Sequence, residues 1–302
     1  MKKMFLLLVF LFINNSFSYF NKDNIATSSV QFLKLGIGSR ATAMGEASSV
    51  IVNDATSLYW NPANLTNINN NSISFMYSSL FADINYQFLG YGHKVGENIS
   101  YGFGIQYLSM DSIEHTDDNG IETGETSKPY DLAVLFGLGY KLSDWSVGVI
   151  EKEISSRILN KINTFAFDFG ILSPVFDKFQ FAGVVQNVGS QIKFDKESDK
   201  LPLNIKGGVA FYLSENFILS SDFCFPIDNT PYFAGGLEYK ILSAGNLQMS
   251  LRGGYNNKSS IDGFSDFSFG AGISIKDLAI DYSFIPKGDL GNINDFSLNI
   301  RF

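Results

Sequence analysis

The sequence predicts an all-β protein, a closed antiparallel transmembrane β-barrel of about fourteen strands with a short, partly helical N-terminal plug in its lumen. Three observations predict this fold class. From residue 72 the chain alternates apolar and polar residues, in segments long enough for a tilted strand to cross a bilayer. Short and long connections alternate between these segments, as periplasmic turns and outer loops do. Aromatic residues make up 15% of the chain, including 29 Phe and 14 Tyr, which suits the aromatic girdles of such barrels.

The first element, residues 1–18, is expected to be a secretory signal peptide. Two lysines precede the apolar run Phe5–Ile13, and the small-x-small site Ser16–Ser18 predicts cleavage after Ser18. The alternative, an N-terminal membrane anchor, is disfavoured because the run is too short to span a bilayer. No Cys lies near the cleavage site, so no lipoprotein is expected. Removing two lysines and no acid takes the net charge from −8 to −10, and such an acidic chain argues against nucleic acid as a partner.

The second element, residues 19–71, is expected to form the plug. Its stretch Phe32–Leu65 shows no strand alternation and is rich in Gly and Ala, which suits a segment packed inside something narrow. We expect it to lie inside the barrel near the periplasmic end. Mean hydropathy of the whole chain is only +0.06, and no apolar run after residue 18 is long enough for a helical span.

Two short helices are expected within the plug. Asp54 is read as the N-cap of one or two helical turns over Ala55–Trp60. The helix should end at Asn61, because Pro62 biases the residue before it away from helical angles. A second helix is expected over 41–47, after a tight turn at glycines 36 and 38.

Arg40 is the charged residue of the plug that calls for a partner. An unpaired charge inside a barrel is very costly, so Arg40 should meet either Asp54 within the plug or an acid on the wall. The main interpretation is structural, with Arg40 pinning the plug to the wall. A direct role in gating or substrate binding is the alternative.

The third element, residues 72–302, is expected to be the barrel. An even number of strands lets both ends of the wall lie on the same side. Glycines inside many strands fit wall curvature and a tightly held plug. The expected strands are Ser72–Ser79, Ile84–Lys94, Ile99–Met110, Tyr130–Leu142, Trp145–Ile154, Ile162–Leu172, Phe179–Val188, Leu203–Leu213, Phe217–Phe225, Tyr232–Leu242, Leu247–Tyr255, Phe267–Ile275, Leu278–Ile285 and Ile293–Phe302.

The last strand defines the two faces of the wall most clearly. Phe296, Leu298 and Ile300 alternate with polar residues and should face lipid together with Phe302. The intervening Ser297, Asn299 and Arg301 should face the lumen. A terminal aromatic residue such as Phe302 resembles the signal that barrel-insertion machinery reads.

The chain shows no constellation of residues for catalysis. It holds two histidines (His93 and His115) and one cysteine (Cys224), and none of the common hydrolase, zinc-protease or phosphate-loop patterns. We therefore expect no enzyme, no metal site and no cofactor, and Cys224 is expected to pack in the wall. The acidic loop over 111–125 could in principle hold Ca²⁺, but it lacks the EF-hand spacing and is read as a solvated surface.

The plug sequence resembles the N-terminal signature of the PorV/PorQ group of outer-membrane proteins, which is related to FadL-type barrels. Later stretches at 184–189, 201–203, 281–284, 288–291, 297–298 and 301–302 also resemble the group. The plug residues that carry the resemblance are Leu35-Gly36, Gly38-Ser39-Arg40-Ala41, Met44-Gly45, Asp54-Ala55 and Leu58-Tyr59-Trp60-Asn61-Pro62-Ala63.

The resemblance implies the outer membrane of a Gram-negative-type bacterium as the location, and outer-membrane lipid and the insertion machinery as partners. It favours a component of type IX protein secretion, which receives secreted cargo by a C-terminal signal domain and delivers it to a surface protease. Cargo and other secretion components would then dock on the outer loops. The alternatives are a FadL-like transporter, with a hydrophobic ligand in an apolar pocket between plug and wall, and a plugged, mainly structural barrel.

Overall fold

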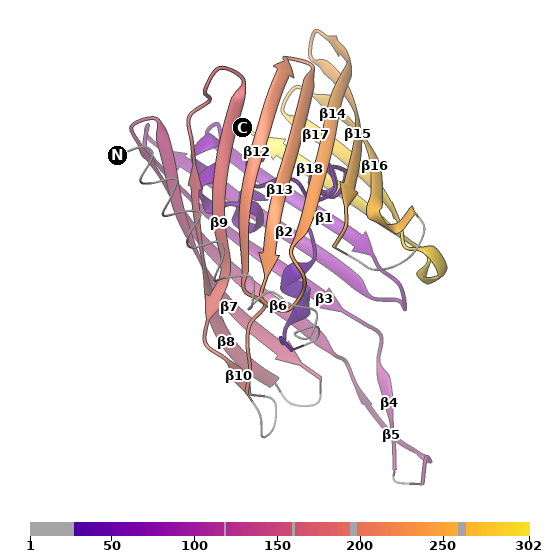
Figure 1. Ribbon diagram of the computed structural model, residues 1–302. Helices are drawn as coiled ribbons and strands as arrows, with labels where there is room; N and C mark the ends of the chain where they lie inside the picture. The colour runs from indigo at the N-terminus through magenta and orange to yellow at the C-terminus, as the bar shows by residue number, and fades with distance from the viewer. Residues whose placement is uncertain (1–26, 118, 159–160, 194–197, 259–263) are drawn as a thin grey trace.

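The computed structural model describes residues 27–117, 119–158, 161–193, 198–258 and 264–302. The expected signal peptide and residues 19–26 lie outside the described residues. Fourteen antiparallel strands form one closed barrel, which confirms the fold class (Figure 1). None of the helices in the described ranges is long and apolar enough to cross a membrane.

The wall contains the fourteen strands that the alternation predicts, with ends shifted by at most a few residues. Each wall strand pairs with its neighbours in the chain order of the wall, and β1 and β18 close the ring. The wall strands are β1 (Asn71–Ser79), β2 (Asn85–Val95), β3 (Ile99–Ser109), β6 (Tyr130–Leu142), β7 (Trp145–Arg157), β8 (Lys161–Leu172), β9 (Phe179–Gly189), β12 (Asn204–Ser214), β13 (Phe217–Pro226), β14 (Tyr232–Ala244), β15 (Leu247–Asn256), β16 (Phe267–Ile275), β17 (Leu278–Pro286) and β18 (Asn292–Arg301).

In the described parts of the long links there are two small hairpins, which were not predicted. One is formed by β4 (Ile113–Thr116) and β5 (Glu122–Ser127), and the other by β10 (Ile192–Lys193) and β11 (Ser198–Asp199). In Figure 1 the β4–β5 hairpin extends beyond the end of the barrel wall. Its residues are nearly all exposed and polar, so there is no apolar face whose alternation could reveal a strand.

The two faces of the wall are as predicted. Phe296 on β18 is 54% exposed, whereas its neighbour Ser297 is 4% exposed. The other strands likewise present large apolar side chains outward. Their inner face is polar or small at most positions, but Met76, Phe88 and Leu135 also point inward, where they are buried with plug residues. Phe302 and Asn71 exchange backbone hydrogen bonds of 3.0 and 3.2 Å, which seals the seam of the barrel. The seam lies at the end with the short turns, which in such barrels is the periplasmic end.

The described part of the plug contains four short helices: η2 (Gln31–Lys34), α2 (Ser39–Ala43), α3 (Ser57–Trp60) and η3 (Pro62–Asn67). The helix expected over 41–47 was placed too late, because Gly45 and Glu46 have φ angles of +65° and +68° and end it. Asp54 was wrongly read as a helix N-cap. The N-cap residue is Thr56, whose backbone N–H and hydroxyl both donate to the Asp54 carboxylate, at 2.9 and 2.6 Å.

The plug runs through the height of the lumen, so its predicted location near the periplasmic end is wrong for its first half. At the outer end, Ser29 N donates to Lys200 O at 3.0 Å, in the β9–β12 link. At the periplasmic end, η3 packs on β6, β7 and β8 near their short turns. Small residues occur along the whole segment, which lets it approach the wall at every level rather than at one end.

Candidate functional site

The plug is seated on glycines of the wall. A Cβ on Gly254 would overlap the backbone nitrogen of Gly45, and one on Gly236 would overlap Met44 O. Met44 is completely buried, and Gly45 itself lies against the backbone of Gly235 and Tyr255. Side chains at these wall positions would push α2 off the wall. The Met44-Gly45 part of the predicted motif therefore lies where plug and wall meet most closely.

Arg40 meets an acid of the wall rather than Asp54. Its Nε lies 2.8 Å from Glu238 Oε2, and its Nη2 donates to Oε1 at 2.9 Å, a bidentate pair with β14. Its Nη1 donates to Ile51 O at 3.2 Å, so the same side chain also bridges two parts of the plug.

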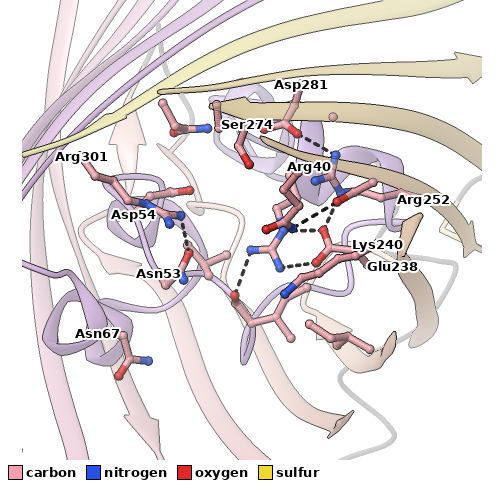
Figure 2. A pocket seen from close by; sticks show the side chains of 18 of the residues that line it. Arg40, Asn53, Asp54, Asn67, Glu238, Lys240, Arg252, Ser274, Asp281 and Arg301 are labelled. Carbon is pink, nitrogen blue, oxygen red and sulfur yellow. Dashed lines mark hydrogen bonds and ion pairs between the residues drawn. The ribbon is translucent and has the colours of Figure 1, made fainter. Parts of the chain in front are cut away.

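Glu238 belongs to a chain of alternating charges (Figure 2). Arg252 on β15 donates to Glu238 Oε2 at 2.6 Å and to Asp281 Oδ1 on β17 at 2.7 Å. Glu238, Arg252 and Asp281 are all buried. This network joins the plug to three strands and leaves none of its four charges alone, as a buried network requires.

Two further acids of the wall hold plug atoms. Asp222 on β13 accepts hydrogen bonds from the backbone nitrogens of Ser48 and Ser49, at 3.2 and 3.0 Å, and from Ser49 Oγ at 2.6 Å. Asp295 on β18 accepts a hydrogen bond of 2.7 Å from the Thr42 hydroxyl of α2. Sequence reasoning named none of these acids. The sequence does contain a signal for them, since each acid lies at an inward-facing position of a strand that is otherwise apolar or rich in small residues.

The second half of the plug motif builds its own support. Trp60 Nε1 donates to Ile37 O at 2.7 Å, and Gln186 of the wall donates to Tyr59 O at 2.6 Å. Asn61 accepts from Ala63 N at 3.0 Å, capping η3, and donates to Ser49 O at 2.9 Å. All of these motif side chains are buried.

Three other motif residues shape the backbone. Pro62 opens η3 and lies against Gly148 of β7. Gly38 has a φ of +86°, which only glycine adopts readily, and leads into α2. A Cβ on Gly36 would crowd Thr42 and Glu46, 3.0 and 3.1 Å away.

The outer end of the plug is held by Asp228 in the β13–β14 link. This buried carboxylate accepts hydrogen bonds from the Ser28 hydroxyl, from Gln31 Nε2 at 2.9 Å and from Lys34 Nζ at 2.9 Å. Burial alone would raise the pKa of Asp228, but these hydrogen bonds and the Lys34 charge hold that pKa below its usual value.

A polar cavity of about 380 Å³ lies beside Arg40, between the plug and strands β9 and β12–β18. Its lining includes Asn67 of η3 and residues near the short turns, such as Lys240, Gln248 and Arg301, which place it at the periplasmic end. Figure 2 shows Arg301 and Lys240 pointing in from opposite sides, with Arg40 between them. The cavity is lined mainly by charged and amide side chains.

An apolar groove of about 560 Å³ lies on the other face of the wall. It is formed by β9 and β12–β16, where outward-facing Gly235 and Gly253 leave space between exposed side chains such as Leu219, Leu237 and Phe269. This groove faces the lipid. Two further cavities between the plug and the wall are much smaller, at about 10 and 20 Å³.

The wall has one irregularity away from its short-turn end. Pairing of β8 with β9 passes from Phe167↔Val188 to Phe169↔Val185, which leaves a bulge opposite Asp168. The Asp168 side chain fills the gap: its Oδ1 accepts a 2.7 Å hydrogen bond from Asn187 N, and its Oδ2 lies 2.7 Å from Lys152 Nζ. Lys152 and Asp168 are completely buried. The bulge is therefore closed by an ion pair.

The remaining candidate residues lie outside the cavity. Cys224 is buried in the wall, and Phe302 is exposed beside the seam. His93 is within hydrogen-bonding distance (2.8 Å) of Asn71, and His115 lies 3.9 Å from Glu125 in the β4–β5 hairpin. In the part of the chain that the structure describes, no three His, Cys, Asp or Glu side chains gather where they could hold a metal ion.

Comparison with known proteins gives one family match. The model of the family described as type IX secretion system protein PorV matches residues 18–228. A search of curated proteins found no match.

Solved structures with a similar fold include two toluene transporters and a FadL homologue. The Ralstonia pickettii toluene transporter TbuX has a TM-score of 0.62 at 13% identity, over 88% of this chain and 98% of its own. The Pseudomonas putida toluene transporter TodX scores 0.60 at 13% identity, over 87% and 96%. A Pseudomonas aeruginosa FadL homologue scores 0.57 at 11% identity, over 88% and 98%. At such identities these structures establish the fold alone.

Proposed function

This chain belongs to the family of type IX secretion system protein PorV, and from that premise we propose that it is a non-enzymatic, permanently plugged barrel that binds secreted proteins or other secretion components at its outer end. It is an outer-membrane β-barrel of the type IX secretion kind, as the family and the fold establish. The observation that carries the proposal is the contrast between a lumen filled by an anchored plug and an outer end that projects a hairpin.

The interior of the barrel gives little support to passage of hydrophobic molecules. The plug is anchored along its length by Asp228, Asp295, Glu238 and Asp222. The interior cavity is polar, and the apolar groove lies on the lipid side. A FadL-like transporter needs an apolar path through the lumen or the wall. The shared fold keeps it as the second candidate, but the cavity beside Arg40 is polar and does not fit such a path.

The β4–β5 hairpin is the feature best suited to contact a partner protein. It combines exposed acids, among them Glu114 and Glu122, with two exposed apolar side chains, Ile113 and Ile121. Ile121 is 65% exposed in the connection between the two strands. An apolar side chain held in water at the tip of a hairpin gains free energy when a partner buries it.

Affinity capture of the full-length protein from detergent-solubilised outer membranes tests the proposal, with mass spectrometry of both proteins and lipids. We expect capture of secreted proteins that share a C-terminal domain, and loss of that capture when residues 113–127 are replaced by a short glycine linker. Asp144→Asn, in a short turn at the opposite end, is the matched control. Unchanged capture by the hairpin-less barrel, or recovery of hydrophobic compounds in place of proteins, would contradict it.

A further inference from the structure

The polar cavity at the periplasmic end has a charge balance that the plug network does not explain. Its lining carries the cations Arg40, Lys240, Arg252 and Arg301 and the acids Asp54, Glu238 and Asp281. Arg40 and Arg252 are satisfied by Glu238 and Asp281. Asp54 accepts its hydrogen bonds from Thr56, a neutral residue.

Lys240 and Arg301 are left without a carboxylate. Within the described ranges Lys240 has no ion pair or hydrogen bond from its side chain, and Arg301 donates only to the neutral Asn53 Oδ1, at 3.0 Å. They come from β14 and β18 and point into the cavity from opposite sides (Figure 2). Counting every charged lining residue, the cavity has one positive charge in excess.

A third observation specifies the ligand further. Asn299, which is 5% exposed and lines this cavity, has a buried amide oxygen without a partner in the described residues. A buried acceptor left unpaired costs free energy, so it calls for a donor from whatever fills the cavity. Gln180 and Gln248 add further amides to the lining.

We propose that this cavity binds a small, singly charged carboxylate that also carries amide N–H groups, the chemistry of a short acylated peptide or of a free peptide end. The carboxylate lies between Lys240 and Arg301, and an N–H donates to Asn299. The single excess positive charge suits a monoanion, while Glu238 and Asp281 disfavour a dianion such as phosphate. A volume of about 380 Å³ suits a small molecule and excludes a folded domain.

The site is independent of the proposed export role, because it uses neither the hairpin nor the outer links. It also differs from the plug anchor, since neither Lys240 nor Arg301 contacts an acid of the plug within 4.0 Å in the described chain.

Calorimetric titration of the full-length protein in detergent with N-acetyl-glycyl-glycine tests the proposal. The matched probe is the same dipeptide with an amidated end, and inorganic phosphate is the dianion. We expect N-acetyl-glycyl-glycine with its free carboxylate to bind at least about tenfold more tightly than the amidated dipeptide or phosphate. A hydrogen bond to a charged group contributes a binding free energy that corresponds to roughly a tenfold change in affinity. Lys240→Gln and Arg301→Gln should each weaken binding about tenfold, and the double variant more. Lys276→Gln, an exposed lysine in a periplasmic turn, should leave binding unchanged.

Heat-modifiable gel mobility establishes that each variant is folded before titration. Equal binding of acid and amide, tighter binding of phosphate, or unchanged affinity in the folded double variant would overturn the proposal. A peptide of about twelve residues with the same end distinguishes the two sources of the ligand. Equal affinity assigns the site to chain ends and loss of affinity assigns it to small solutes, and either result supports the carboxylate chemistry.

Discussion

Replacing Arg40 by alanine should loosen the plug while the barrel wall stays intact. The substitution removes two charge-assisted hydrogen bonds to Glu238 and one to Ile51 O. Breaking a buried pair costs about 3–5 kcal/mol, mostly because the remaining partner is left alone. Here Glu238 keeps Arg252 at 2.6 Å, so the cost should fall at the low end, about 3 kcal/mol. That free energy corresponds to roughly a hundredfold rise in the ratio of released to seated plug.

The same geometry predicts an order among variants. Glu238→Gln leaves Arg40 and Arg252 facing one neutral amide, and only Arg252 keeps another acid, Asp281. It should therefore release the plug more than Arg40→Ala does. Asp222 and Asp295 still hold the plug in both variants, so release should be transient.

Planar-bilayer recording and limited proteolysis measure this release. Arg40→Ala should raise the open fraction and expose the N-terminal segment to protease. The β-sheet signal should stay unchanged, because the wall has its own hydrogen-bonded ladder. Arg157→Ala, an exposed arginine at the outer end of β7, is the control. Wild-type conductance together with wild-type protease resistance in Arg40→Ala would refute the role of this pair. The plug would then be held by Trp60, Tyr59 and its glycine contacts.

Four further predictions follow from particular contacts. Gly254→Ala should displace α2 from the wall and raise the conductance in bilayer recordings. Gly207→Ala should leave the conductance unchanged, because a Cβ there meets nothing within 4 Å, and equal effects of the two variants would refute the close-packing argument. Lys152→Met should lower the stability of the barrel by about 3–5 kcal/mol, because it leaves buried Asp168 without its cation, and adding Asp168→Asn should restore part of that stability. The temperature at which the gel mobility changes on heating measures this stability, and an unchanged temperature in Lys152→Met would contradict the prediction. Because the pKa of Asp228 is depressed in the folded protein, the stabilisation of the plug by Asp228 is complete above the unfolded pKa of about 4 and is lost as pH falls through the folded pKa. A spin label at Ser29→Cys should therefore become mobile only in acid, whereas in Asp228→Asn it should be mobile at every pH. Equal mobility of the label in both proteins at neutral pH would exclude this anchor. Deleting Phe302 should reduce the amount of assembled barrel in the outer membrane, because it removes the backbone bonds to Asn71 at the seam, and normal amounts would refute this.

The wall could be predicted strand by strand because alternation is a local property. Phe296, Ser297 and their neighbours show which face each residue takes without knowledge of any partner strand. The β4–β5 hairpin was missed because its side chains are exposed on both faces, so burial leaves no pattern in the sequence. The β10–β11 hairpin was missed because two residues per strand are too few to show an alternation.

The interior of the barrel could be predicted only in part. The sequence indicated that Arg40 needed an acid, but the choice of Glu238, 198 positions away, depends on how β14 is placed around the ring. The Met44-Gly45 contact with Gly236 and Gly254 depends on the same placement. The predicted position of the plug along the barrel axis was wrong for its first half, because composition carries no information about which end of the lumen a segment occupies. The acids Asp222 and Asp295 could have been found by marking each charged residue at the inward phase of a strand.

The central claim is that this plugged barrel serves protein export rather than passage of hydrophobic molecules. The most direct measurement uses native cells that lack the protein, and follows in one experiment the surface proteins and the uptake of a radiolabelled monoaromatic compound. The account predicts that proteins with the shared C-terminal domain disappear from the surface and accumulate inside, that uptake is unchanged, and that the hairpin-less barrel fails to restore the surface proteins. Reduced uptake with a normal set of surface proteins would contradict it.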